Sequence, residues 1–237
     1  MTAAPADPDP DQGPDDHWVQ WHQPYEDPDS PLSLRLRVVQ GALGAALVRA
    51  PAGPIRVLSV CAGQGRDVID VLAEHPRALD VEALLVELSP DLVRCAGQRA
   101  EAAGVSGQVT VVEGDAAQSH LYADLVPAQV VLVCGVFGNI SHDDIAATVA
   151  ALPGFCAPGA SVIWTRHRRP PDTTHQVRAD FAAAGFDEVS FEAPPDPYVL
   201  AVGHHRLAVE PPAGGHPAAF DPGRVLFTFI GDGFAPA

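Results

Sequence analysis

Residues 57–72 read VLSVCAGQGRDVIDVL, an apolar run that stops at a loop with two glycines and continues into a helical pattern. A strand, a tight glycine loop and a helix in this order are typical of a nucleotide-binding crevice in an α/β protein. Gly63 and Gly65 let the backbone approach a ligand closely, because glycine carries no side chain. Cys61 and Ala62 stand where further glycine would be expected, so the loop alone does not identify the ligand.

Short apolar runs alternate with helical patterns on both sides of this loop. A first helix is expected over 29–50, with Ser30 as its cap and Pro31 at its first position. The expected strands are 55–60, 81–87, 107–115, 128–136 and 159–167, and the later helices are 66–74, 89–104, 118–126, 141–155 and 173–186. Strands separated by helices indicate βαβ units and a parallel sheet.

The alternation ends after GFDEVSFEAP, residues 185–194. Residues 198–210 and 224–230 are β-like, and the Pro/Gly-rich loop between them leaves no room for a crossover helix, which favours antiparallel pairing. The predicted fold is therefore α/β: a Rossmann-like, doubly wound, seven-stranded sheet that is mostly parallel and has an antiparallel C-terminal strand. Three parts are expected along the chain: an acidic, proline-rich disordered tail (1–16), a helical lid or cap (17–54) and one core domain (55–237).

Composition excludes several kinds of partner and chemistry. The 30 acidic and 14 basic residues give a net charge of −16, which argues against a nucleic acid or an anionic membrane as the partner. Every basic residue is arginine, so lysine-based phosphate binding and Schiff-base chemistry are excluded. The four cysteines have no paired spacing, as is usual for reduced thiols. No signal peptide opens the chain and no apolar stretch is long enough to span a bilayer. A cytoplasmic protein is therefore expected.

The carboxyl ends of the expected strands carry groups that suit adenosine. In a parallel sheet these ends meet at one edge, where ligands bind. Glu87 ends the second strand and is placed to accept hydrogen bonds from both hydroxyls of a ribose. Asp115 ends the third strand and can accept from an exocyclic amine, while the N–H of Ala116 can donate to a ring nitrogen.

The ordered motifs VLSVCAGQGRD, LLVELSP, VVEGDAA and VLVCGVFGNIS resemble those of class I S-adenosylmethionine-dependent methyltransferases over roughly residues 55–192. The resemblance implies S-adenosyl-L-methionine as cofactor and in-line methyl transfer to an acceptor. The residues that it assigns to the cofactor are Cys61, Ala62, Gly63, Gly65, Asp67, Glu87, Leu88, Asp115, Ala116, Cys134, Gly135 and Val136.

The first motif departs from the family at two positions. The family often has an acidic residue where Ser59 stands and a glycine where Cys61 stands. The usual anchor for the amino group of the donor is therefore missing from its common place. Asp67 or backbone carbonyls are expected to take that role.

Two other functions stay open. An NAD(P)-dependent oxidoreductase would need a GxGxxG loop, but this loop has only Gly63 and Gly65, and Asp67 near the third position would repel a pyrophosphate. A domain of the same fold could also bind an adenosine-type ligand without catalysis.

The candidates for the acceptor side are less specific. Methyl transfer needs a general base only if the acceptor must lose a proton. The expected base candidates are His22, Tyr25, His142 and His167, and the expected substrate-binding residues are Trp18, Trp21, Phe137, Asn139 and Arg166.

Each of these candidates has a plainer explanation. The aromatic stretch 17–28 would either cover the crevice as a lid or pack against the sheet, and Phe137 would either line the site or fill the core. The arginines at 166–169 would form either a clamp for an acidic substrate or a solvated turn. His204 and His205 lack a third ligand at metal spacing, so no metal is expected. The expected acceptor is a small molecule or a peptide, and the expected assembly is a monomer or a homodimer.

Overall fold

The computed structural model describes residue 25 and residues 27–193, 200–208 and 219–230. Its strands are β1 (Ile55–Val60), β2 (Val81–Glu87), β3 (Val109–Glu113), β4 (Ala128–Val133), β5 (Cys156–His167), β6 (Phe186–Glu192) and β7 (Leu200–Leu207). Its helices are α2 (Pro31–Arg49), α3 (Arg66–Glu74), α4 (Pro90–Ala102), α5 (His142–Ala151) and α6 (Thr174–Ala183), with 3₁₀ turns η2 (Ala78–Asp80), η3 (Ser119–Tyr122) and η4 (Leu152–Gly154). Within these residues, no helix is both long and apolar enough to cross a membrane.

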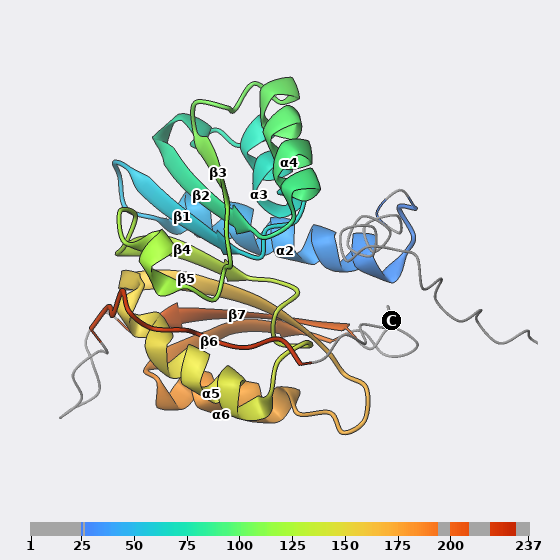
Figure 1. The fold of residues 1–237 in the computed structure, drawn as a ribbon, viewed down its shortest axis with the longest axis vertical. Coiled ribbons are helices and arrows are strands. Elements are labelled where there is room, and N and C mark those ends of the chain that lie inside the picture. The colour runs from blue at the N-terminus through green and yellow to red at the C-terminus, as the bar shows by residue number, and fades with distance from the viewer. Residues whose placement is uncertain (1–24, 26, 194–199, 209–218, 231–237) are drawn as a thin grey trace, which may run out of the picture.

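The strands form one seven-stranded sheet in the order β3-β2-β1-β4-β5-β7-β6 (Figure 1). β1 to β5 pair in parallel, whereas β7 runs antiparallel to both β5 and β6. The predicted Rossmann-like, mostly parallel fold is therefore confirmed. The strand order reverses between β1 and β4, which is the point where such sheets bind their ligands.

Two expectations about local structure were wrong. Residues 224–230 do not pair with β7, because β5 and β6 occupy both of its edges. That segment forms isolated bridges instead, Gln118 with Val225 and Ile140 with Phe229. The helix expected over 118–126 is only the 3₁₀ turn η3, because the chain must extend again to enter β4 at Ala128.

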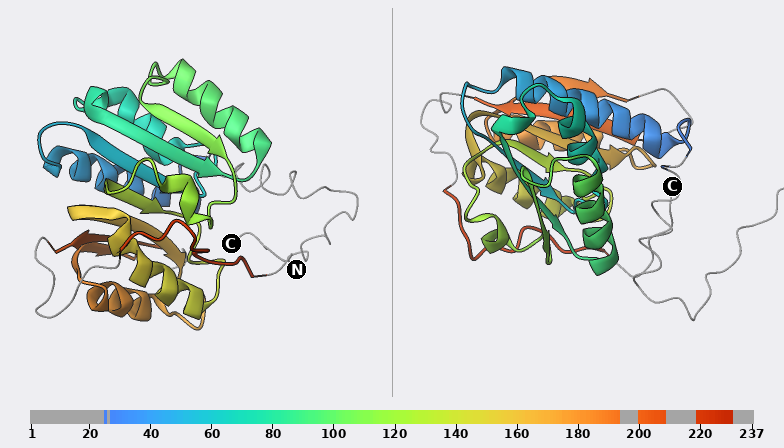
Figure 2. Two further views of the ribbon diagram at one scale, coloured as in Figure 1. Left: turned by 60° about the vertical axis from the view of Figure 1, so that its left-hand side comes forward. Right: turned by 90° about the horizontal axis from the view of Figure 1, so that it is seen from above.

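Helices cover both faces of the sheet (Figure 2). One core lies between the sheet and α2, α3 and α4, with Leu43 of α2 and Ile69 of α3 fully buried. The other lies under α5 and α6, where Phe137, Trp164 and Phe181 form an aromatic cluster. Residues 219–230 also cross this second face, and their Leu226 and Phe227 join its core.

α2 is anchored to the sheet rather than standing apart from it. Its cap is the one expected, since Ser30 Oγ accepts from Ser33 N at 3.1 Å and Pro31 opens the helix. Val39, Leu43 and Leu47 bury their side chains in the core, where α2 packs over β4, β5 and β7. The tail (1–16) and most of the aromatic stretch (17–24 and 26) lie outside the described residues, so their disorder and lid role stay predictions.

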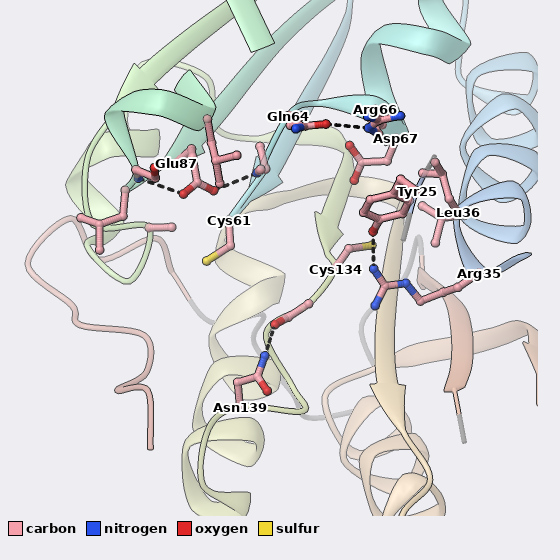
Figure 3. Close-up of a pocket in the computed structure, with 18 of the residues that line it drawn as sticks. Tyr25, Arg35, Leu36, Cys61, Gln64, Arg66, Asp67, Glu87, Cys134 and Asn139 are labelled. Carbon is pink, nitrogen blue, oxygen red and sulfur yellow. Dashed lines mark hydrogen bonds between the residues drawn. The ribbon is translucent and has the colours of Figure 1, made fainter. Parts of the chain in front are cut away.

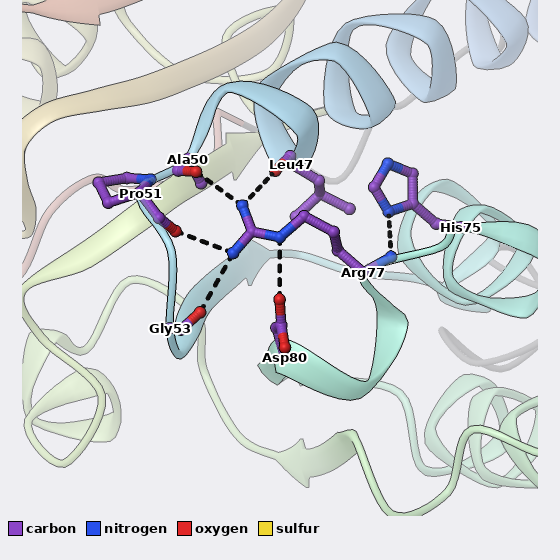
Figure 4. A network of polar contacts seen from close by, with 7 residues as sticks. All are labelled: Leu47, Ala50, Pro51, Gly53, His75, Arg77 and Asp80. Carbon is purple, nitrogen blue, oxygen red and sulfur yellow. Dashed lines mark hydrogen bonds and ion pairs between the residues drawn. The ribbon is translucent and has the colours of Figure 1, made fainter.

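Arg77 closes the C-terminal end of α2 (Figure 4). Its guanidinium donates to the carbonyl oxygens of Leu47, Ala50, Pro51 and Gly53 and to the carboxylate of Asp80, over 2.6–3.2 Å. The last carbonyls of a helix have no partner within the helix and carry partial negative charge, so a cation there is favourable. One side chain thereby fixes α2, the turn before β1 and the start of β2.

Replacing Arg77 by alanine should lower the free energy of unfolding by about 2 kcal/mol, because several charge-assisted hydrogen bonds are lost together. Arg94→Ala is the matched control, since among the described residues Arg94 makes an exposed ion pair with Asp91 and no other polar contact, and such pairs contribute about 0–1 kcal/mol. Urea denaturation of both variants measures the difference. Equal, small losses would show that the Arg77 network does not hold α2.

Candidate active site

A cavity of about 320 Å³ lies at the carboxyl ends of β1, β2 and β4 (Figure 3). This volume is at the small end of the range for ligand sites. The cavity is lined by Tyr25, Arg35, Leu36, Val39, Cys61, Ala62, Gly63, Gln64, Arg66, Asp67, Glu87, Leu88, Ser89, Leu92, Asp115, Ala116, Cys134, Gly135, Asn139 and Phe229. Ten of the twelve residues expected at the cofactor are in this set; Gly65 and Val136 are not.

The loop after β1 is shaped by left-handed backbone conformations. Cys61, Gly63 and Gly65 have φ values of 55°, 56° and 68°. Gly65 does not line the cavity; it is the N-cap of α3, and a Cβ there would lie 2.6 Å from Ile69 Cδ1 and 2.8 Å from Leu85 Cδ2. Its role is to let α3 approach the sheet closely.

Glu87 is held rigidly under this loop. Its side chain is buried, and the residue is 8% exposed. Oε2 accepts from Gly63 N at 2.8 Å, and Oε1 accepts from Ser89 N at 3.0 Å. Each carboxylate oxygen can accept a second hydrogen bond, so the carboxylate is pre-oriented to meet two donors from the cavity.

Asp115 has a structural role beside any role in binding. Its Oδ1 accepts from Ala117 N at 3.0 Å and its Oδ2 accepts from Gln118 Nε2 at 3.2 Å, which stabilises the turn into η3. Cys61 lies near both Glu87 and Asp115. Burial, and then these two carboxylates, hold the pKa of the Cys61 thiol well above its usual value, so the thiol stays protonated.

Asp67 is the third carboxylate of the cavity. It lies in the first turn of α3 and is 9% exposed, and its Oδ1 has no hydrogen-bond partner among the described residues. Burial raises the pKa of this carboxyl to about 6, although nearby backbone N–H groups and Arg35 act in the opposite direction.

Sequence reasoning missed a cluster of α2 and α3 residues around Tyr25. Arg35 donates to Tyr25 Oη at 2.6 Å, and the guanidinium of Arg66 lies over the Tyr25 ring, 5.4 Å from its centroid. Burial raises the pKa of the Tyr25 phenol. The helical pattern of residues 29–50 predicted α2, but it gave no sign that Leu36 and Val39 of this helix line a ligand cavity.

The C-terminal segment supplies a further residue that sequence reasoning missed, Phe229. The backbone of this segment is fixed at Asn139, whose carbonyl accepts from Ile230 N at 2.9 Å. Asn139 itself lines the cavity as expected, and its Nδ2 donates to the carbonyl of Gly135 at 2.5 Å.

Four expected acceptor-side residues do not line the cavity. Phe137 is fully buried among aromatic rings, and its carbonyl accepts from Arg166. His142 lies beside Asp180 at 4.0 Å, and His167 packs against Gly138. Trp18, Trp21 and His22 lie outside the described residues, so Tyr25 is the base candidate that the structure places at the cavity.

The histidines of β7 belong to the core. His204 contacts Ser161 Oγ at 3.0 Å, and His205 accepts from Trp164 Nε1 at 3.1 Å. Burial lowers the pKa of both imidazoles to about 4. The described residues contain no group of three or more side chains suited to hold a metal ion.

A family model described as "Putative methyltransferase" matches residues 34–179. The chain belongs to this methyltransferase family. The match runs from α2 into α6 and includes Arg35, Asp67, Glu87 and Asp115, whereas Tyr25 and Phe229 lie outside it. No curated protein matches the chain by sequence.

Solved methyltransferase structures share the fold. An O-methyltransferase family protein from Burkholderia thailandensis superposes with a TM-score of 0.60 at 15% identity; the match covers 82% of this chain and 58% of that protein. Magnesium protoporphyrin IX methyltransferase from Synechocystis PCC 6803, with bound S-adenosylmethionine, gives 0.60 at 14% identity, covering 81% and 91%. A methyltransferase from Thiobacillus denitrificans in complex with S-adenosylhomocysteine gives 0.54 at 23% identity, covering 77% and 74%.

The packing of this methyltransferase loop can be tested at Gly65. Gly65→Ala should lower the free energy of unfolding by about 2 kcal/mol or more, because the new methyl group overlaps Ile69 and the backbone is left-handed. Gly97→Ala in α4, where nothing lies within 4 Å of a new Cβ, should instead raise stability by about 0.5–1 kcal/mol. Thermal and urea unfolding of both variants measure this, and an unaffected Gly65→Ala protein would contradict the assigned role.

Proposed function

We propose that this protein is an S-adenosylmethionine-dependent methyltransferase that acts on a small-molecule acceptor, and that the cavity beside Glu87 holds the donor. The observation that carries this proposal is the buried Glu87 carboxylate, fixed by Gly63 N and Ser89 N at the end of β2. A carboxylate with this orientation suits the two hydroxyls of a ribose. The solved relatives from Synechocystis and Thiobacillus hold the donor or its demethylated product.

The adenine ring suits the carboxyl end of β3, which lies next to β2 in the sheet. Asp115 and Ala116 line the cavity beyond Glu87, and Asp115 can accept from the exocyclic amine. Leu88 also lines it and is 63% exposed, so it is available to cover one face of a flat ring. The cavity is lined by carboxylates, and the chain has no lysine to bind a phosphate. Such a site suits a ligand that carries a positive charge and no phosphate.

The donor, when bound, supplies a methyl group on a sulfonium that is already activated. The chemistry that it would supply is transfer of that methyl group to a lone pair of the acceptor, with the electrons of the broken carbon–sulfur bond kept by sulfur. The protein must then align the two reactants and exclude water. Asn139 and Phe229 lie on the wall from which an acceptor would approach, beside Gly135.

We do not expect Tyr25 or Cys134 to act as a general base that accepts a proton from the methyl acceptor. Burial raises the pKa of both, so each keeps its proton at neutral pH. In this proposal Tyr25 serves as a hydrogen-bonding wall residue. The aromatic stretch before it remains a proposed lid over the acceptor.

The small acceptor and the cellular location are inferred from the character of the chain. The net charge of −16 does not suit a nucleic-acid acceptor. All four cysteines are free, which supports a reducing compartment such as the cytoplasm.

Titration calorimetry with the purified protein tests the proposed donor. S-adenosylmethionine and S-adenosylhomocysteine should both bind, and NADH should not, because Asp67 at the loop repels a pyrophosphate. Heat with NADH alone would replace the proposal by an oxidoreductase. Binding without methyl transfer to any acceptor in a broad panel would favour a non-catalytic binding domain.

Glu87→Gln should weaken S-adenosylhomocysteine at least tenfold, because hydrogen bonds to a charged group contribute about 1.5–3 kcal/mol each. Glu113→Gln is the control, since Glu113 is the neighbour of Glu87 on β3 but is exposed and outside the cavity. Calorimetry on both variants, with circular dichroism to verify folding, gives the comparison. An unchanged dissociation constant in folded Glu87→Gln would place the sugar elsewhere.

A further inference from the structure

The cavity has a second polar end, separate from the end that suits adenosine. Asp67, Arg35, Tyr25 and Cys134 influence one another electrostatically. Cys61, Glu87 and Asp115 form the other such group. Figure 3 shows Glu87 on one side of the loop after β1, and Tyr25, Arg35 and Asp67 on the other.

We infer that Asp67 and Arg35 form a binding site for the zwitterionic α-amino-acid group of the methyl donor, with Asp67 taking the ammonium and Arg35 the carboxylate. This inference rests on the proposed function, since it assumes that the donor's adenosine lies at Glu87. It assigns a residue outside the glycine motif, Arg35 of α2, to donor recognition.

The surroundings of Asp67 point to a cationic ligand. Its carboxylate is nine-tenths buried, lines the cavity and has an Oδ1 without a hydrogen-bond partner among the described residues. It also forms no ion pair with any described residue. Backbone N–H groups stabilise this carboxylate only in part, since Oδ1 accepts no hydrogen bond and the group has no ion-pair partner among the described residues. Burying such a charge is costly, and a ligand ammonium would lower that cost.

Ser59 does not compete for this role. It occupies the position where related methyltransferases often have an acid, but it is 1% exposed, lies within β1 and does not line the cavity. Asp67 is the carboxylate that the described structure places at this end of the cavity. The missing acid of the motif is thus replaced from the first turn of α3.

The guanidinium of Arg35 is oriented to bind a carboxylate. Its Nη2 donates to Tyr25 Oη at 2.6 Å, which fixes the direction of the guanidinium at the cavity wall. A guanidinium offers several donors in one plane and suits a carboxylate. Arg66, the other arginine of the cavity, instead donates from Nε to Gln64 at 2.7 Å and stacks on Tyr25.

The two charges suit a zwitterion better than a simple ion. Arg35 is close enough to Asp67 to lower the pKa of its carboxyl, yet the two form no ion pair within 4.0 Å. An α-amino-acid group can bridge such a separated pair, and neither charge of the ligand is then buried alone. A ligand with only one of the two charges would meet only one of these two protein groups.

A double-mutant cycle between the protein and the ligand tests this inference by calorimetry. The ligands are S-adenosylhomocysteine and its decarboxylated analogue, which keeps the ammonium and lacks the carboxylate. The variants are Arg35→Met and Asp67→Asn. Arg37→Met is the matched control, because Arg37 lies on the same helix but is exposed and contacts the carbonyl of Pro28.

Arg35→Met should weaken S-adenosylhomocysteine at least tenfold and the decarboxylated analogue less than threefold. Asp67→Asn should weaken both ligands at least tenfold, and Arg37→Met should change neither. Equal losses for both ligands in Arg35→Met, or no loss, would overturn the assignment of the carboxylate. Wild-type protein that binds neither ligand would instead refute the proposed function itself.

The pH dependence separates a direct role of Asp67 from a structural one. Its carboxyl loses charge as the pH falls through about 6, so the affinity of wild type for S-adenosylhomocysteine should fall between pH 7.5 and pH 5. Arg35 of α2, Asp70 of α3, Tyr25 and Cys134 also face this group, and Asp67→Asn leaves them in place. The affinity of Asp67→Asn should change less than twofold over this range; the same slope in both proteins would overturn the role of Asp67.

Discussion

The site depends on the hydrogen bonds that the Glu87 carboxylate accepts from Gly63 N and Ser89 N. One side chain thereby ties the glycine loop after β1 to the segment between β2 and α4. The loop can hold its left-handed conformations because both of its ends are fixed, by Glu87 on one side and by the packing of Gly65 against Ile69 and Leu85 on the other. The cavity is the space that this arrangement leaves at the sheet edge.

The charges around that space are arranged in two groups rather than spread evenly. At one end, Glu87 and Asp115 offer carboxylate oxygens as acceptors, which suit hydroxyls and an amine. At the other end, Asp67 and Arg35 offer one charge of each sign. A ligand with a neutral adenosine and a zwitterionic tail matches this order, whereas a dinucleotide would bring its pyrophosphate toward Asp67.

The sequence predicted the parts of the site that depend on local pattern. The glycine loop, Glu87 and Asp115 follow buried strands, and the edge where parallel strands end is determined by the βαβ repeat itself. Arg35 could not be found in this way, because its position relative to the loop depends on how α2 crosses the sheet. Phe229 was missed for the same reason: residues 224–230 have a strand-like pattern, yet both edges of β7 were already occupied and the segment crosses to Asn139. Phe137 and His167 also follow strand ends, but the local pattern does not show that the side chain of Phe137 is buried in the aromatic core.

A crystal structure of the protein with S-adenosylhomocysteine tests the central claim most directly. We expect to find the ribose hydroxyls on Glu87, the adenine amine at Asp115, and the amino-acid group between Asp67 and Arg35. A ligand bound in the reverse direction, with its amino-acid group at Glu87, or bound outside this cavity, would contradict it.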